Sequence, residues 1–133
     1  MKAVKGRITK GVQRGSYLQA CDNSGAKVLY IIAFINFKGS KGRNPSGGVG
    51  DHVIASVRSG SPEMRKKVVG AIIVRQKKEY RRSDGLRVKF EDNAAVVLKD
   101  DKGNPKGTLV KGPIAKEVVA RWPAVAKIAK AVV

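Results

Sequence analysis

The stretch that most constrains the fold is residues 28–37, VLYIIAFINF, which is apolar at almost every position. Successive side chains of a β-strand point to opposite faces, so this strand has no polar face to turn toward water. One face would carry Leu29, Ile31, Ala33, Ile35 and Phe37, and the other Val28, Tyr30, Ile32 and Phe34. The sequence therefore predicts a strand that is covered on both sides.

Other short strand-like segments surround this one. Residues 51–58 alternate between apolar and polar side chains, which is typical of a half-buried strand. The predicted inward residues are Val53, Ala55 and Val57, and the outward residues are His52, Ser56 and Arg58. SYLQAC, VVGAIIV and AAVVLK are further short runs, separated by turn-forming sequences at 22–25 and 101–105. Five or more short strands at this spacing favour a mainly β chain that folds as a small barrel.

Residues 75–90, RQKKEYRRSDGLRVKF, form a basic segment between two of the apolar runs. The segment contains seven cations and only two acids, Glu79 and Asp84, so its local charge is +5. The cations are Arg75, Lys77, Lys78, Arg81, Arg82, Arg87 and Lys89. Asp84-Gly85 predicts a hairpin turn, because glycine takes the positive φ that such a turn requires.

The register of this hairpin follows from its side chains. A three-residue loop with Gly85 in the left-handed conformation would pair Tyr80 with Val88 and Glu79 with Lys89, whereas a two-residue loop would place Tyr80 opposite Lys89. Because apolar and opposite-charge pairs across strands are stabilising, we expect the three-residue loop. The hairpin has little other apolar surface, so we expect a ribbon that projects with its cations in solvent or on a polyanion. Surfaces charged only for solubility intersperse both signs, so we favour binding.

Two more segments are basic and rich in glycine. Residues 1–15 contain no acid, and we interpret them as an extended arm that RNA orders, with a disordered tail as the alternative. The cations of this arm are Lys2, Lys5, Arg7, Lys10 and Arg14. Residues 39–50, GSKGRNPSGGVG, match neither a Walker A nor a dinucleotide-binding fingerprint. With Lys41 and Arg43, they fit equally a loop whose backbone approaches phosphate and a plain long hairpin loop.

The period becomes helical in residues 113–133. Pro113 suits the first position of a helix, and Pro123 would end that helix. One face of it would carry Ile114, Val118 and Trp122. A second short amphipathic helix would follow, with an apolar stripe at Val125, Ile128, Ala129 and Val132. We expect both helices to cover the outer face of residues 28–37; the alternative is a stripe that awaits a partner protein.

Composition narrows the choice of partner. The 133 residues include 28 Lys and Arg against 10 Asp and Glu, a net charge of +18. We expect one domain whose default partner is nucleic acid. A membrane is the competing polyanion, but the cations form no basic amphipathic helix and the longest apolar run is too short to cross a bilayer. Cys21 is the only cysteine, so we expect a buried thiol in a reducing compartment, and the N-terminal residues give no signal for export.

Enzyme chemistry finds little support in the sequence. His52 is the only histidine and Cys21 the only thiol, so no metal-ligand spacing is present, and we expect neither catalysis nor a cofactor. Asp51 and His52 would point to opposite faces of a strand, so we interpret His52 as a surface residue. A free single-strand-binding protein would stack bases on exposed aromatics, whereas most of the aromatics here fit a core. The aromatics are Tyr17, Tyr30, Phe34, Phe37, Tyr80, Phe90 and Trp122.

Several motifs together resemble those of a known family. Ala71-Ile72-Ile73-Val74 lies nine residues before Asp84-Gly85, and Phe90, Asn93 and Val96-Val97 follow. The remaining matches are Asp22-Asn23-Ser24-Gly25-Ala26-Lys27, Gly48-Val49-Gly50-Asp51, Gly107-Thr108, Gly112-Pro113 and Glu117. In combination they make residues 16–133 similar to the universal large-subunit ribosomal protein family numbered fourteen. The basic arm, EYRRSDG, FEDNA and the ending Arg121-Trp122-Pro123 resemble its archaeal and eukaryotic branch, although Cys21 stands where Val or Ala is commoner.

The resemblance implies a five-stranded barrel with a projecting ribbon and two short C-terminal helices. We divide the chain into an arm (1–15), the barrel with its ribbon (16–112) and a tail (113–133). The implied role is structural, in the large subunit of cytoplasmic ribosomes. The implied partners are large-subunit rRNA, small-subunit rRNA at intersubunit bridges, neighbouring ribosomal proteins and an anti-association initiation factor.

The resemblance and the basic segments together give two sets of candidate site residues. The expected rRNA contacts are Arg14, Lys41, Arg43, Arg75, Lys77, Lys78, Arg81, Arg82, Arg87 and Lys89. The expected protein-facing residues are Thr108, Gly112, Pro113, Lys116 and Glu117.

Overall fold

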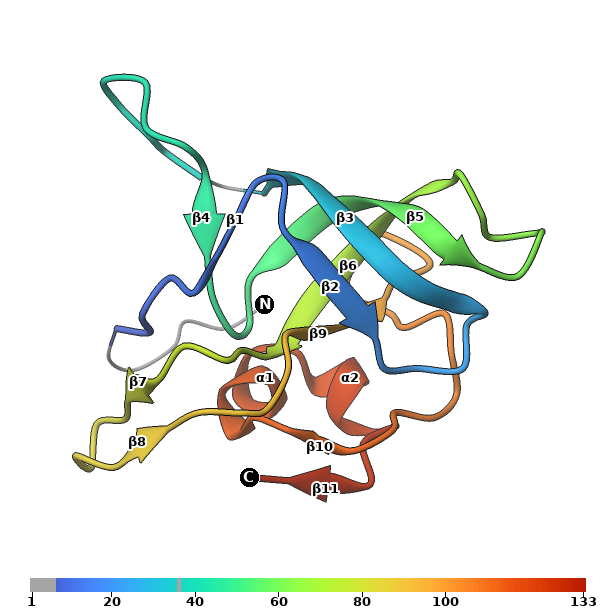
Figure 1. Cartoon of the computed structure of the whole chain (residues 1–133). Coiled ribbons are helices and arrows are strands. Elements are labelled where there is room, and N and C mark those ends of the chain that lie inside the picture. Colours follow the sequence, from blue (N-terminus) through green and yellow to red (C-terminus); the bar gives the residue numbers. More distant parts are fainter. Residues whose placement is uncertain (1–6, 36) are drawn as a thin grey trace.

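Five strands form a closed barrel in the order β2-β3-β5-β6-β9 (Figure 1). The structure is a computed structural model that describes residues 7–35 and 37–133. The barrel strands are β2 Tyr17–Ala20, β3 Ala26–Phe34, β5 His52–Gly60, β6 Val68–Arg75 and β9 Ala94–Val97. Neighbouring strands are antiparallel, except that β2 and β9 close the barrel in parallel. The predicted mainly β fold with a small barrel is confirmed.

Three short strand pairs and two helices lie outside the barrel. The pairs are β1 Val12–Gln13 with β4 Ser46–Gly47, β7 Tyr80–Arg81 with β8 Arg87–Val88, and β10 Pro113–Ile114 with β11 Ala131–Val132. The helices are α1 Lys116–Arg121 and α2 Pro123–Ala126. The first six residues of the predicted arm, with Lys2 and Lys5, lie outside the described residues.

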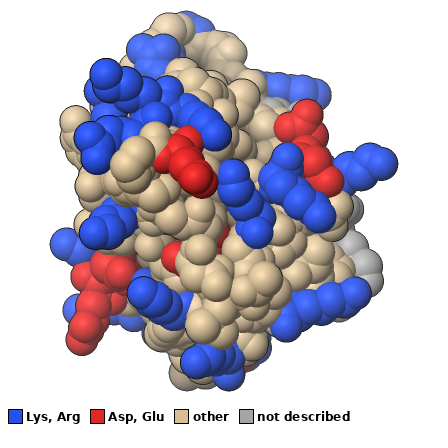
Figure 2. Space-filling model, turned by 90° about the vertical axis from the view of Figure 1, so that its right-hand side faces the viewer, with Lys and Arg blue, Asp and Glu red and all other residues tan. Residues whose placement is uncertain are grey.

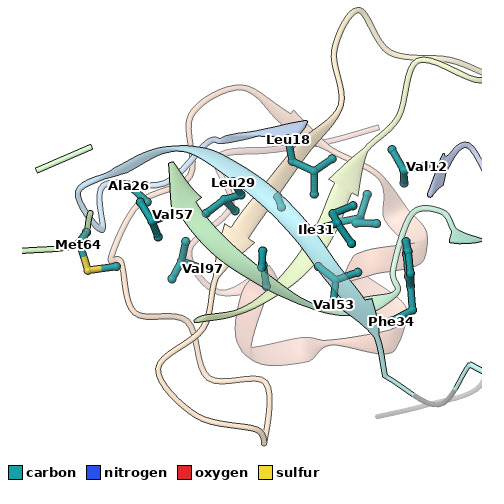
Figure 3. Packing of buried hydrophobic residues seen from close by; sticks show 14 residues of the cluster. Val12, Leu18, Ala26, Leu29, Ile31, Phe34, Val53, Val57, Met64 and Val97 are labelled. Atoms are coloured by element: carbon teal, nitrogen blue, oxygen red, sulfur yellow. The ribbon is translucent and has the colours of Figure 1, made fainter. Parts of the chain in front are cut away.

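The barrel interior is closed by side chains at both ends. Figure 3 shows the inward residues of the strands, with Met64 at one end and Val12 and Phe34 at the other. Met64 and Val12 are each only 2% exposed. Met64 comes from the basic turn between β5 and β6, and Val12 comes from the predicted arm. Part of the segment predicted to be an extended basic arm therefore packs into the barrel.

The two helices do not cover the outer face of β3, although the sequence predicted that they would. On β3 the outward Val28 and Tyr30 are half-buried and Ile32 is 39% exposed. The helical residues pack instead on the outer faces of β6 and β9, in a second apolar cluster separate from the barrel interior. This cluster includes Ile72, Val74, Val96, Val118, Trp122 and Val125. The outward residues of β6 and β9 form an unbroken aliphatic surface, whereas Tyr30 gives β3 a polar tip that water can solvate.

The tail also differs from its prediction at both ends. Pro113 lies in β10, not in a helix, and α1 begins at Lys116. The first helix ends before Pro123, as predicted, but α2 stops at Ala126 and Val132 belongs to β11. The chain returns because β11 bonds to β10: the N–H of Val133 donates to Ile114 O at 2.9 Å. Pairing between distant segments has overridden the local helical period.

His52 and Cys21 are both buried under this cover. The interpretation of His52 as a surface residue is wrong: it is 7% exposed and its ring meets that of Trp122 edge-on at 5.6 Å. Burial lowers the pKa of His52. Cys21 is buried, as predicted, and burial raises its pKa to about 12, so the thiol stays protonated. No helix in the described chain is long and apolar enough to span a bilayer.

Trp122 should be the side chain that attaches the tail to the barrel. It is 5% exposed, and its Nε1 donates to the carbonyl of Gly50 at 2.7 Å. Replacing it by Ala removes both the packing and this bond, so we expect Trp122→Ala to lower the free energy of unfolding by about 3 to 5 kcal/mol. Urea denaturation measures this, with the half-exposed Val132→Ala as the control. Equal stability of the two variants would contradict the role given to Trp122.

Candidate nucleic-acid interface

The basic ribbon has the predicted three-residue loop. Tyr80 pairs with Val88 and Arg81 with Arg87, and Gly85 has a φ of +93°. The predicted pairing is therefore confirmed for Tyr80, while Glu79 forms an ion pair with the diagonal Arg87 (Oε1–Nη1 3.5 Å) instead of Lys89. Five exposed cations remain on the ribbon: Lys77, Lys78, Arg81, Arg87 and Lys89.

Arg82, by contrast, points toward the body of the protein. Its Nε lies 2.7 Å from Glu117 Oε1 on α1, and both side chains are only 10% exposed. The same guanidinium donates to the carbonyl of Val133, and the hydroxyl of Tyr80 donates to Glu117 Oε2 at 2.9 Å. Burial, followed by the nearby Glu117 carboxylate, raises the pKa of Tyr80 to about 12. The expectation that the ribbon cations lie in solvent or on a polyanion is wrong for Arg82, because Glu117 binds it.

Arg75 is a second ribbon cation whose side chain is buried in the protein. It is 8% exposed and forms a bidentate pair with Asp92 (2.8 and 3.0 Å). Its remaining donor, Nη1, binds the carbonyls of Lys111 and Pro113 at 3.0 and 2.9 Å. Arg75 therefore fixes the start of the tail to the base of the ribbon, and its guanidinium is occupied by protein acceptors. The sequence reasoning missed Asp92 as the partner of Arg75.

Gln76 brings the three basic segments together and was also missed. Its side chain is fully buried, and its Nε2 donates to the carbonyls of Thr9 and Lys78 at 3.0 and 2.8 Å. Its Oε1 accepts from the N–H of Val49 at 2.9 Å. One amide thus binds the arm, the glycine-rich loop and the ribbon. A Cβ at Gly48 would lie 2.6 Å from Gln76 Oε1, which explains glycine at that position.

These bonds gather the basic segments on one side of the molecule. In Figure 1 the strands of the arm, the loop and the ribbon (β1, β4, β7 and β8) all lie on the left. The predicted contacts Arg14, Lys41 and Arg43 are exposed there. Figure 2 views the opposite end, where Lys and Arg also outnumber Asp and Glu. The fold therefore presents an organised cationic side on a molecule that is positive over much of its surface.

The residues predicted to face a protein partner are more scattered. Thr108 is exposed, although its N–H and hydroxyl bond to the side chain of Asn23. Gly112 and Lys116 are exposed and Pro113 is half-buried. Glu117 is only 8% exposed and is occupied by Arg82, so the expectation that it is exposed is wrong.

A pocket of about 650 Å³ separates the ribbon base from the tail. Val88, Phe90, Pro113 and Val133 line its apolar part, and Arg75 and Asp92 its polar part. Within the described residues, no group of three or more His, Cys, Asp or Glu is placed to hold a metal ion. The geometry therefore offers exposed cationic side chains and a pocket lined by both apolar and charged residues.

Comparison with known proteins identifies the family. Residues 11–133 match the family model described as Ribosomal protein L14p/L23e. The chain belongs to this family. "Large ribosomal subunit protein uL14" of Nanoarchaeum equitans is 53% identical over 133 residues, the whole of both chains. The proteins of the same name from Methanothrix thermoacetophila and Halobacterium salinarum are 49% and 48% identical, again over the whole of both chains. The resemblance to this family, and to its archaeal relatives, is confirmed.

The pair of Arg82 and Glu117 gives this L14p/L23e member a testable anchor for its ribbon. Removing one partner leaves a buried charge without its counterion, so we expect Arg82→Ala to lower the free energy of unfolding by about 3 kcal/mol. Arg81→Ala, one residue away and exposed, should change it by less than about 0.5 kcal/mol. Urea denaturation of both variants measures the difference.

A double-variant cycle with Glu117→Ala checks the cause. If the two side chains act through each other, the double variant will be more stable than the sum of the single losses predicts. Additive losses would show that Arg82 and Glu117 stabilise the protein independently.

Proposed function

We propose that this protein is a structural constituent of the large ribosomal subunit and binds large-subunit rRNA through its cationic side. The observation that carries the proposal is the fixing of arm, loop and ribbon by Gln76, with exposed cations on all three. Cations held in a fixed array neutralise phosphates without first losing conformational freedom. Such contacts read the shape of the RNA backbone and carry no base sequence by themselves.

The proposed contacts are narrower than the predicted set. Arg75 and Arg82 are left out, because carboxylates and carbonyls of the protein occupy their guanidinium groups. Arg75 and Arg82 instead fix the position of the ribbon on which the exposed cations lie. The proposed rRNA contacts are Arg14, Lys41, Arg43, Lys77, Lys78, Arg81, Arg87 and Lys89.

Membership of the family suggests further partners, and for each of them we propose only the general region of the surface that it would contact. Small-subunit rRNA at an intersubunit bridge would meet further surface cations, since positive charge extends beyond the ribbon. A ribosomal protein or an anti-association factor would dock near the tail, where Lys116 is exposed and Val132 and Val133 are 50% and 51% exposed. The place of action would be the cytoplasmic ribosome.

Salt dependence tests the electrostatic mechanism. Neutralising about six phosphates would give a slope of log affinity against log salt near −5. Replacing Lys77, Lys78, Arg81 and Arg87 with Ala should make this slope shallower by roughly three, because each lost phosphate contact removes about 0.8 of a unit. Filter binding to large-subunit rRNA across a salt series measures the slope.

The matched control removes the same charge elsewhere. Lys99, Lys102, Lys127 and Lys130 are exposed outside the arm, the loop and the ribbon, so their replacement by Ala should leave most of the slope intact. Equal changes in the two variants would mean that net charge, and not the ribbon, governs binding. A wild-type affinity that is flat across the series would contradict the proposed mechanism altogether.

Protein docking on the tail is tested at Lys116 alone. Because its side chain is exposed and makes no ion pair in the described structure, Lys116→Glu should leave the fold and incorporation into the subunit intact. It should weaken binding of an anti-association factor to purified large subunits by several-fold, as charge reversal at an interface does. Lys127→Glu on the neighbouring turn is the control. Unchanged factor binding would remove this part of the proposal.

A further inference from the structure

The outer face of β2, β3 and β5 carries an aromatic cluster that the proposed function leaves unused. Tyr17 and Tyr30 are directly opposite in the ladder, and their rings meet edge-on with centroids 5.4 Å apart. The guanidinium of Arg58 lies 4.5 Å from the centre of the Tyr30 ring. Tyr30 is thereby held by two neighbours. Tyr17 is 60% exposed, while the other six aromatic side chains are buried or half-buried.

The position of Tyr17 makes it a fixed ring. It begins a barrel strand whose next residue, Leu18, is 1% exposed in the core, so its backbone cannot shift without disturbing the core. Its ring contact with Tyr30 adds a specific geometry on the outside. An exposed aromatic that is already ordered loses little entropy when a ligand stacks on it. Ile32, 39% exposed on the same face of β3, extends the apolar surface.

The charged residues near the aromatic cluster indicate which class of ligand would bind there. The three strands contain no Asp or Glu, whereas Lys27 and Arg58 lie on them and are exposed. Arg14 is exposed just before Gly15, whose N–H donates to Ile31 on β3 at 3.0 Å. An exposed ring on a face that carries exposed cations and no carboxylate on its strands suits a nucleotide, whose base would stack while its phosphates lie near the cations. A protein segment would need acidic residues to match these cations.

We propose that Tyr17, supported by Tyr30 and Arg58, is a stacking platform for an unpaired base of RNA. The inference rests on the proposed rRNA binding and adds a second, non-electrostatic contact to it. The two contacts lie on different surfaces: the ribbon cations neutralise phosphates, and Tyr17 binds a base that has left its helix. Stacking tolerates any base, so the platform requires an unpaired nucleotide at a fixed place and selects no particular sequence.

The test compares a short oligouridylate with an abasic oligomer of the same length and charge, at low salt, on the full-length protein. We expect the wild-type protein to bind the base-containing oligomer roughly fivefold more tightly, or more, by fluorescence anisotropy. Tyr17→Leu should abolish this preference, whereas Tyr17→Phe, which keeps the ring, should retain it. Thermal unfolding should be unchanged in both variants, because the side chain is exposed.

The ribbon variant separates this inference from the proposed function. Replacing Lys77, Lys78, Arg81 and Arg87 with Ala should keep the preference for the base-containing oligomer, because these side chains lie on a different surface from Tyr17. Equal affinity of the wild-type protein for the two oligomers overturns the platform while leaving phosphate binding in place; no binding of either oligomer overturns both. A Tyr17→Leu variant that keeps the base preference but loses a ribosomal protein neighbour in reconstituted subunits overturns the platform in favour of a protein contact.

Discussion

Strand β6 is buried on both faces, and the parts of the molecule outside the barrel depend on it. Ala71 and Ile73 point into the barrel, while Ile72 and Val74 lie under the helices. A strand held on both sides has one register, because a shift of one residue would exchange its two faces. Its last residue, Arg75, and the adjoining Gln76 lead directly into the ribbon. The rigid wall of the barrel thus sets the direction in which the ribbon leaves.

A chain with a net charge of +18 must also limit its own repulsion. In the described structure, four of its ten carboxylates form ion pairs with cations, and three more accept hydrogen bonds from the chain's own N–H and side-chain groups. They are Asp22, Asp51, Glu79, Asp84, Asp92, Asp100 and Glu117. Two of them neutralise Arg75 and Arg82, the most enclosed cations of the ribbon. The acids therefore order the protein at a few points, and most of the exposed cations in the described residues form no ion pair.

The sequence predicted what depends on local chemistry. Alternation identified β5, the Asp84-Gly85 turn predicted the hairpin, and the pairing of Tyr80 with Val88 gave its register, because these signals lie within a few residues of the structure that they determine. The role of Arg82 could not be predicted from the sequence, because its partner Glu117 lies 35 residues away in the chain. Glu117 also lies on a helix that was predicted to begin at Pro113 and begins at Lys116. The same holds for His52, which is covered by Trp122 from the far end of the chain. Burial of a polar residue is decided by distant packing, which a periodic pattern does not contain.

Glu117 connects the two proposed surfaces. Its carboxylate binds Arg82 and Tyr80 of the ribbon, while its backbone belongs to α1, beside the exposed Lys116. Arg82 also binds the carbonyl of Val133, at the edge where β11 is exposed. The surface proposed for a protein partner and the ribbon proposed for rRNA therefore share one set of contacts. If rRNA binds the ribbon as proposed, it would also restrain α1 and the C-terminal residue, because Arg82 binds both. The two proposed surfaces are thus joined in the structure through the buried carboxylate of Glu117.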